Sequence, residues 1–296
     1  MLTRQKCLLY MIERAGRAVG HLELTKWAFL VARETRSAGG GSFYDFVPYL
    51  YGPFSFTLFR EADTLVREGY LRETKDGKAW ERGDGANGNT DTLSPAIRFD
   101  VAGVVERFAR RASDELVDYV YTGFPWYTAN SRIKRLAERQ NAMPAVYTVG
   151  YERWSVDRLL DEVMLAGISR IIDVRSNPVA RRYGFHRSSL SRVAGKVGLE
   201  YVHVPEVGIP SSLRHDLDGM EDYDRLFDHY TNTLLPSQPD AVRRVSDLVI
   251  QKASVLLCME ADPALCHRTR LAAIISSMTH LPVRDIRGIE CGPITS

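Results

Sequence analysis

The densest group of chemically capable side chains lies between residues 258 and 268. It contains Cys258, Glu260, Cys266, His267 and Arg268. A thiol can act as a nucleophile, a carboxylate can transfer a proton, and an arginine can bind anionic oxygens. We therefore expect a catalytic group here, with Glu260 as general acid or base, Cys266 as nucleophile and Arg268 as anion-binding residue.

The local sequence predicts how this group is presented. Asp262 is a good N-cap and Pro263 a good first helical residue, so we expect a helix over residues 263–278. Its first turns would carry Cys266, and the positive end of the helix dipole would attract an anion and lower the pKa of that thiol.

Several other chemistries lack their sequence patterns. The cysteines do not show the Cys-x-x-Cys spacing of structural zinc sites, so we expect no metal ion. Neither cysteine is followed at the phosphatase spacing by an arginine. No Gly-x-x-x-x-Gly-Lys loop or Gly-x-Gly-x-x-Gly motif occurs, so we expect no nucleotide cofactor.

Polar side chains also follow three other apolar runs that are typical of strands. Because the carboxyl ends of parallel strands meet at one edge of a sheet, we expect these residues to converge with the 258–268 group on a shared pocket. We add Asp173 and Arg175 to the catalytic candidates. The ligand-binding candidates are Gly150, Tyr151, Arg182, His203 and Glu206.

The second half of the chain supplies the elements that would position these residues. Short apolar runs alternate with helical patterns, which predicts an α/β domain with a mostly parallel sheet and helices on both faces. We place this domain at residues 144–296. The expected strands cover residues 146–149, 170–174, 201–204, 254–258 and 283–286.

The first half predicts a smaller, mainly helical domain over residues 1–143. Its clearest helix follows Ser55 and ends at Gly69, and a hairpin with the turn Asp76-Gly77 comes next. Three helices before a hairpin is the order of a winged helix, which would contact nucleic acid through exposed cations. These are Arg60, Arg67, Arg72, Lys75 and Lys78. A protein-interaction or dimerisation module is the alternative. A long helix is expected over residues 101–121.

Composition sets the wider limits. The 296 residues favour two domains at roughly 100–200 residues each. No apolar run approaches the ~20 residues that cross a bilayer, and no signal peptide is evident, so we expect a cytoplasmic protein without membrane contact. The formal net charge is +2, and the excess of basic residues lies in residues 1–143, which points weakly to a polyanionic partner there.

Four segments in this order resemble a bacterial family catalogued as domain of unknown function 488. They are Tyr147–Tyr151, Asp173–Ser176, Tyr201–Gly208 and Cys258–Arg268. In relatives the first segment often reads Thr-Ile-Gly-His, and Tyr151 stands at the histidine position here. The resemblance implies the α/β fold and the site for residues from 145 onward, and it implies no particular reaction.

The first half resembles the helical winged module that often precedes this family, including the segment Tyr51–Ser55, and it has a fainter likeness to the Panacea antitoxin domain. Three functions follow from these observations. The first is a nucleic-acid-associated enzyme that acts on a base, sugar or phosphate of DNA or RNA. The second is a winged-helix regulator whose α/β domain senses a small anion. The third is a defence or antitoxin-type module that binds a protein.

Overall fold

A computed structural model describes residues 1–86, 88, 90–214 and 219–288. The chain forms two compact units, which comprise residues 1–138 and 139–288 of the described part. Arg139 belongs to the second unit because its guanidinium donates hydrogen bonds to the carbonyl groups of Ile168 and Val197.

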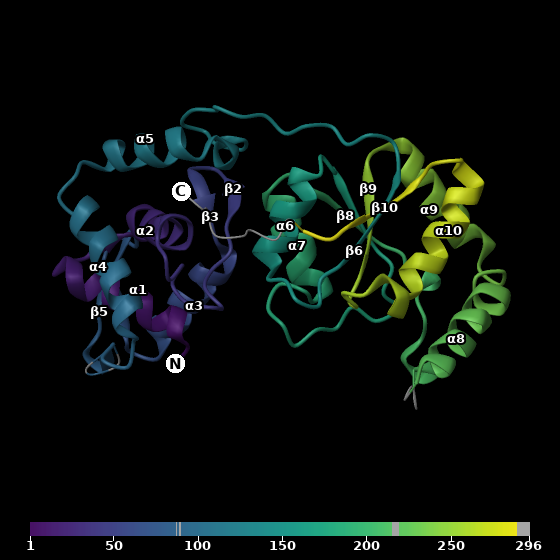
Figure 1. The fold of residues 1–296 in the computed structure, drawn as a ribbon, viewed down its shortest axis with the longest axis horizontal. Helices are drawn as coiled ribbons and strands as arrows, with labels where there is room; N and C mark the ends of the chain where they lie inside the picture. Colours follow the sequence, from purple (N-terminus) through teal and green to yellow (C-terminus); the bar gives the residue numbers. More distant parts are fainter. Residues whose placement is uncertain (87, 89, 215–218, 289–296) are drawn as a thin grey trace. The chain divides into compact units, whose positions relative to one another are not determined.

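The first unit is mainly helical (Figure 1). Its helices are α1 (Thr3–Ala15), α2 (His21–Glu34), α3 (Phe56–Arg67), α4 (Pro95–Phe108) and α5 (Ser113–Gly123). Three short strands form an antiparallel sheet in the order β1-β5-β4, with β1 at Val19–Gly20, β4 at Leu71–Glu73 and β5 at Ala79–Arg82. A separate antiparallel pair consists of β2 (Val47–Tyr49) and β3 (Gly52–Phe54).

Helix α3 has the start and the end that the sequence predicts. The Ser55 hydroxyl accepts a hydrogen bond from the backbone N–H of Leu58, and Gly69 adopts the left-handed conformation just after the helix. Leu58 and Leu65 are buried on its inner face. The β4–β5 hairpin then follows, as expected.

The single long helix expected over residues 101–121 is wrong. Two helices, α4 and α5, occupy this region and are separated by residues 109–112. The backbone carbonyl of Ala109, at the end of α4, accepts a hydrogen bond from the Arg17 side chain instead of continuing the helix. Side-chain donors of this kind satisfy the last carbonyl groups of a helix.

The second unit contains a five-stranded parallel sheet in the order β10-β6-β9-β7-β8. The strands are β6 (Val146–Gly150), β7 (Arg170–Asp173), β8 (Glu200–His203), β9 (Ser254–Cys258) and β10 (Val283–Ile286). Strand β9 is buried along its whole length, which explains why its sequence is a nearly continuous apolar run. Strand β7 is also buried throughout, although a charged residue stands at each of its ends.

Helices cover both faces of this sheet (Figure 1). Helices α6 (Val156–Leu165) and α7 (Arg187–Lys196) lie on one face, and α9 (Pro239–Gln251) and α10 (His267–Thr279) lie on the other. Helix α8 (Met220–His229) lies beyond the second pair. The predicted α/β class, with a parallel sheet preceded by a mainly helical part, is confirmed.

The strand order fixes where a ligand site can form. From β7 the chain moves outward to its neighbour β8, and from β9 it moves in the opposite direction, past β6, to β10. The connections therefore diverge between the carboxyl ends of β7 and β9. Open parallel sheets bind ligands at such a point.

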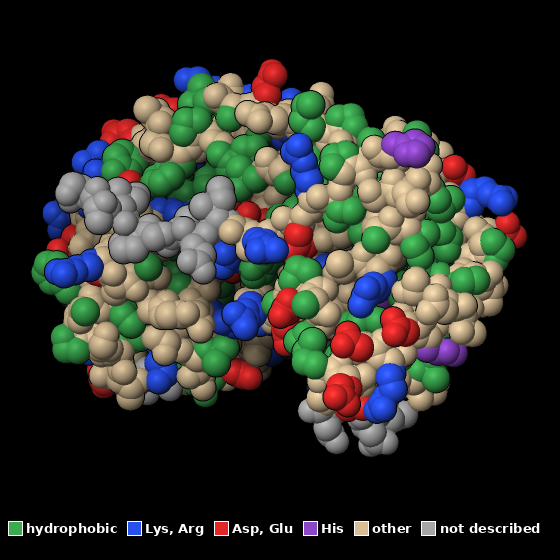
Figure 2. Space-filling model, turned by 45° about the vertical axis from the view of Figure 1, so that its right-hand side comes forward, with side chains coloured by type: hydrophobic (Ala, Val, Ile, Leu, Met, Phe, Trp, Pro, Cys, Tyr) green, Lys and Arg blue, Asp and Glu red, His purple; other side chains and the backbone are tan. Residues whose placement is uncertain are grey.

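Neither positive nor negative side chains predominate on the face of the molecule that is in view. Figure 2 shows Lys and Arg side chains interspersed with Asp and Glu side chains. Among the described residues, no helix combines the length and the apolar character that a membrane crossing requires.

Candidate functional site

The polar residues at the strand ends converge as the parallel register requires. Gly150 is paired with Cys258, and Asp173 is paired with both Leu257 and His203. These positions form the carboxyl edge of the sheet. The motifs around Gly150, Asp173, His203 and Cys258 therefore lie side by side.

Asp173 and Arg175 form a buried ion pair at the end of β7. The Asp173 side chain is inaccessible to solvent and accepts hydrogen bonds from the Arg175 guanidinium and from the Tyr201 hydroxyl, the latter at 2.6 Å. Burial opposes the charge on Arg175, but the hydrogen bonds and charge of Asp173 outweigh it and raise the pKa of Arg175. Asp173 thus holds Arg175 and has no oxygen left over for a ligand.

Arg175 also connects this pair to the loop after β6. Its Nη1 donates to the Tyr151 hydroxyl at 2.7 Å and to the carbonyl of Phe185 at 3.0 Å. The rings of Tyr151 and Phe185 are stacked, with centroids 3.9 Å apart. Arg182 is exposed and donates to the carbonyl groups of Tyr151 and Glu152.

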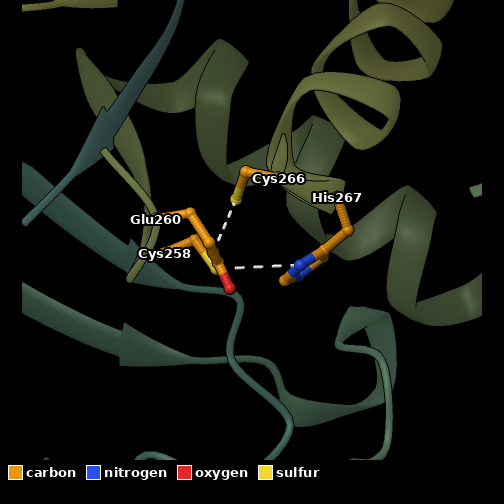
Figure 3. A group of neighbouring side chains, drawn as sticks. All are labelled: Cys258, Glu260, Cys266 and His267. Carbon is orange, nitrogen blue, oxygen red and sulfur yellow. Dashed lines mark hydrogen bonds between the residues drawn. The ribbon is translucent and has the colours of Figure 1, made fainter. Parts of the chain in front are cut away.

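Four donor side chains cluster at the end of β9 (Figure 3): Cys258, Glu260, Cys266 and His267. Glu260 Oε2 lies 3.0 Å from the Sγ of Cys258 and 3.0 Å from the Sγ of Cys266. The Sγ of Cys258 lies 3.7 Å from the Nδ1 of His267. We call these residues the Cys–Glu–His cluster.

The electrostatics of the cluster correct the expectation for Cys266. Burial, followed by interaction with Cys258, raises the pKa of the Cys266 thiol well above its ordinary value, where the sequence suggested a lowered one. For Glu260, burial acts to raise the pKa, but the hydrogen bonds from both thiols and the nearby charge of Arg214 lower it to about 2. Glu260 is therefore a carboxylate at neutral pH.

The helix start expected at Pro263 is also wrong. Asp262 caps only a short 3-10 turn, Pro263–Leu265, and α10 begins at His267 with Cys266 as its N-cap. Cys266 therefore precedes the helix and faces the cluster. The turn folds the chain back so that Cys266 meets Cys258 and Glu260.

Arg268 lies outside the pocket that we expected it to line. Its side chain is fully buried, donates to the carbonyl of Glu260 at 2.5 Å and approaches an Asp285 carboxylate oxygen to 3.6 Å. A Cβ added at Gly150 would stand 1.8 Å from the same Glu260 carbonyl. Arg268 thus pins the Glu260 loop against β6, and only glycine at position 150 allows this approach.

His203 and Glu206 occupy less central places. His203 is partly buried, and its Nε2 donates to the carbonyl of Arg175 at 2.8 Å. This contact orients the loop after β7. Glu206 is exposed, in the short turn Pro205–Val207, and lines neither of the cavities described below.

Two adjoining cavities open at the diverging point between β7 and β9. The smaller has a volume of about 110 Å³, and the larger has a volume of about 460 Å³. Arg175, Tyr151 and Cys258 line the smaller cavity, and His267 lines the larger. Glu260 lines both, whereas Asp173 and Arg268 line neither.

Sequence reasoning missed Arg214, which also lines both cavities. Its Nη1 donates to Glu260 Oε1 at 2.8 Å, and its Nη2 lies 3.1 Å from His267 Nδ1. Its Nε is buried and has no hydrogen-bond partner in the described part of the chain. No motif marks this arginine, because it lies after the segment Tyr201–Gly208 and 46 residues before Glu260 in sequence.

The five cations proposed for nucleic-acid contact are exposed in the first unit. Arg60 and Arg67 lie on α3, and Arg72, Lys75 and Lys78 lie on or between β4 and β5. Exposed acids, among them Asp63, Glu68 and Asp76, lie between them. Arg72 is 3.3 Å from Glu81.

Comparison with known proteins identifies one family. Residues 155–275 match the profile of a family described as "Domain of unknown function DUF488". Comparisons with curated proteins and with solved structures returned no match. The matched range runs from the cap of α6 to α10 and includes β7, β8, β9 and the Cys–Glu–His cluster. Residues 155–275, which lie within the second unit, are therefore similar to the DUF488 family.

Proposed function

We propose that this protein is a regulator that binds nucleic acid through its first unit and a small anionic ligand through its second unit. One observation carries the proposal. Arg214 and Glu260 face two adjoining cavities, and Arg175 faces the smaller of them, at the point where the strand connections diverge.

The arginines favour an anionic group on the ligand. A guanidinium presents several N–H donors in a planar fork, which suits phosphate and carboxylate oxygens. Arg214 has a buried Nε without a partner among the described residues, and Arg175 is held in place by Asp173. The smaller cavity, which both arginines line, matches a phosphate-sized group.

The larger cavity suits a base or sugar ring that is attached to the anionic group of the ligand. Its volume of about 460 Å³ lies within the range of small-molecule sites, roughly 300–1,000 Å³. Apolar and aromatic side chains, among them Ile209, Tyr223 and Phe227, form much of its wall. Glu260 Oε1 accepts one hydrogen bond from Arg214, and it can accept a second from a hydroxyl or amino group of the ligand. A nucleotide or sugar phosphate combines these features.

The state of the expected catalytic residues favours binding over turnover. Asp173 and Arg268 are engaged in interior ion pairs, and the Cys266 thiol is buried with a raised pKa. A thiol of raised pKa is a poor nucleophile because only the thiolate attacks.

An enzyme remains the second candidate, on one observation. Cys258 and Glu260 line the same small cavity as Arg175. A ligand held by the arginines would therefore lie next to a thiol and a carboxylate. In that case the ligand would be chemically changed when it is incubated with the protein.

The first unit supports nucleic-acid contact by the placement of its cations. Helix α3 exposes Arg60 and Arg67 to solvent, and the β4–β5 hairpin exposes three further cations. Nucleic-acid affinity depends largely on such contacts with phosphates.

The test measures nucleic-acid affinity with and without ligand. Labelled duplex DNA and single-stranded RNA of mixed sequence are titrated with the full chain by fluorescence anisotropy, with inorganic phosphate or each of four ribonucleoside monophosphates present. We expect at least one ligand to change the affinity about fivefold or more. Mass spectrometry should recover that ligand unchanged.

Three results would overturn the proposal. The first is a nucleic-acid affinity that stays constant with every ligand, and the second is an absence of nucleic-acid binding. The third is a chemically converted ligand, which would indicate an enzyme in place of a regulator. A protein partner that copurifies in equal amount without nucleic acid would favour the interaction module instead.

A further inference from the structure

We propose that Cys258, Glu260, Cys266 and His267 together hold one Zn²⁺ ion. The four donor atoms lie within 4.8 Å of one another. Ligand bonds of ~2.0–2.3 Å to a tetrahedral zinc place neighbouring donors roughly 3.3–3.8 Å apart. The contacts of 3.0, 3.0 and 3.7 Å in the cluster need only small shifts to reach that arrangement. This proposal does not rest on the proposed function.

The imidazole of His267 is already set in the tautomer that a metal requires. Its Nε2 lies 3.1 Å from the carbonyl of Val174, which can only accept a hydrogen bond, so Nε2 carries the proton. Nδ1 then keeps its lone pair and faces the two thiols (Figure 3). Metal-binding histidines characteristically donate their other ring N–H to a carbonyl or carboxylate in this way.

The charges around the cluster are suited to a divalent cation. Two thiolates and one carboxylate carry three negative charges, and Zn²⁺ leaves one of these uncompensated. The Arg214 guanidinium, 2.8 Å from Glu260 Oε1, supplies the balancing positive charge. Zinc entry displaces the two thiol protons. When zinc binds Nδ1 of His267, the contact between Nδ1 and Arg214 Nη2 is lost. Arg214 Nη2 then becomes available to a ligand in the cavities.

The donor set selects the metal and its role. Thiolates and imidazole favour zinc over Mg²⁺ or Ca²⁺, which prefer oxygen ligands. Cys258, Cys266 and His267 are each only 1% exposed. The Glu260 side chain is 18% exposed. Four protein ligands fill a tetrahedral coordination sphere, which is typical of structural zinc. The ion would join the end of β9 to the start of α10 and fix the loop between them.

This site has no standard sequence signature. The pattern Cys-x-Glu-x₅-Cys-His lacks the Cys-x-x-Cys spacing that led us to expect no metal. The 3-10 turn Pro263–Leu265 provides the reversal that a Cys-x-x-Cys turn provides elsewhere. The donors therefore meet only in the folded chain.

The experiment measures zinc in the full chain, produced without a polyhistidine tag. Reduced protein is incubated with excess Zn²⁺, passed through a desalting column and analysed by inductively coupled plasma mass spectrometry. We expect about one zinc per chain. The variants Cys258→Ser and Cys266→Ser should lose most of it. Cys7→Ser is the matched control, because Cys7 is also buried but lies in the first unit, and it should retain the full amount.

A second readout covers variants that fail to fold. The wild-type chain loaded with Co²⁺ should show thiolate-to-cobalt charge transfer and the visible bands of a tetrahedral ion, and zinc-edge X-ray absorption should find two sulfur and two lighter ligands. No retained zinc in the reduced wild-type chain would overturn the proposal. So would a Cys258→Ser/Cys266→Ser variant with as much zinc as Cys7→Ser, or a Cys258–Cys266 disulfide in protein purified without oxygen.

Discussion

The two units bury positive charge in different ways. In the first unit, Lys26 is 1% exposed, donates to the carbonyl of Tyr51 at 2.7 Å and lies 5.4 Å from the centre of the Tyr121 ring. Burial lowers its pKa to about 7. In the second unit, Arg175 is also buried, at 7% exposed, but it is paired with Asp173, and its pKa is raised.

Lys26 and Arg175 therefore differ in what they do for their units: the lysine fills space in the fold, whereas the arginine holds a charge in a fixed position. Lys26, with a pKa of about 7, is only partly charged at neutral pH, and it anchors the β2–β3 turn without a paired carboxylate among the described residues. An arginine–carboxylate pair keeps both charges and fixes their direction, which costs desolvation unless the geometry is good. The second unit has such a pair at the end of β7, and its Arg175 lines the smaller cavity, where a fixed positive charge would suit the anionic ligand that we propose.

The largest expected effect comes from breaking the second unit's pair. Asp173→Asn leaves the buried Arg175 without a counter-charge, so we expect the second unit to lose about 3–5 kcal/mol of stability. Hydrogen exchange along a urea series reports each unit separately. Asp240→Asn is the control, because Asp240 is 95% exposed beside Arg243 and should change stability by less than about 0.5 kcal/mol. Equal effects at the two positions would contradict the account.

The next largest effect is expected for Gly150→Ala, which tests how closely the Glu260 loop packs against β6. Gly150→Ala places a Cβ 1.8 Å from the Glu260 carbonyl, so the loop must move and stability should fall by about 1–3 kcal/mol. Zinc content should fall with it. Gly195→Ala in α7 meets nothing within 4 Å and should be neutral or stabilising by up to about 1 kcal/mol. A Gly150→Ala variant as stable as Gly195→Ala would show that the loop is not constrained there.

Lys26 should make the stability of the first unit depend on pH. The pKa of Lys26 is about 7 in the folded chain and near 10.5 when unfolded, so the unfolded chain binds more protons between these values. Stability of the first unit should therefore fall as the pH drops from 10.5 to about 7, by at most ~1.4 kcal/mol per pH unit. Lys26→Met should flatten this dependence. If the two pH profiles of unfolding are parallel, Lys26 keeps its charge in the fold.

The smallest effects concern the exposed cations of the first unit. Arg60→Gln and Arg67→Gln should each reduce the slope of log affinity for duplex DNA against log salt by up to about 0.9. Arg243→Gln, an exposed arginine of α9, should leave the slope unchanged. Unchanged slopes for all three variants would remove α3 from the nucleic-acid contact.

Much of the fold could be predicted because local signals agree with the final structure. The Ser55 cap and Gly69 define α3, and alternating strand and helix patterns define the parallel sheet. The prediction for residues 101–121 was wrong because the local sequence does not show that Arg17, far away in sequence, donates to the backbone carbonyl of Ala109 at the end of α4. Such competition is settled by tertiary contacts.

The candidate site could be located but not resolved in detail. Parallel strand ends place Asp173 and Cys258 at one edge, so the region was predictable. Which side chain faces a cavity depends on pairing across the fold: Asp285 takes Arg268 into the interior, while Arg214 reaches Glu260 from a distant loop. The spacing of residues along the chain predicts neither of these two contacts.

The central claim is that the crevice between β7 and β9 binds an anionic ligand through Arg214. Isothermal titration calorimetry of the full chain with inorganic phosphate and with ribonucleoside monophosphates tests it directly, using Arg214→Met and the exposed-arginine control Arg243→Met. We predict that at least one of these ligands binds the wild-type chain and Arg243→Met equally. It should bind Arg214→Met about tenfold or more weakly, as expected for the loss of a charged hydrogen bond. Equal binding to all three proteins, or no binding to the wild-type chain, would contradict the account.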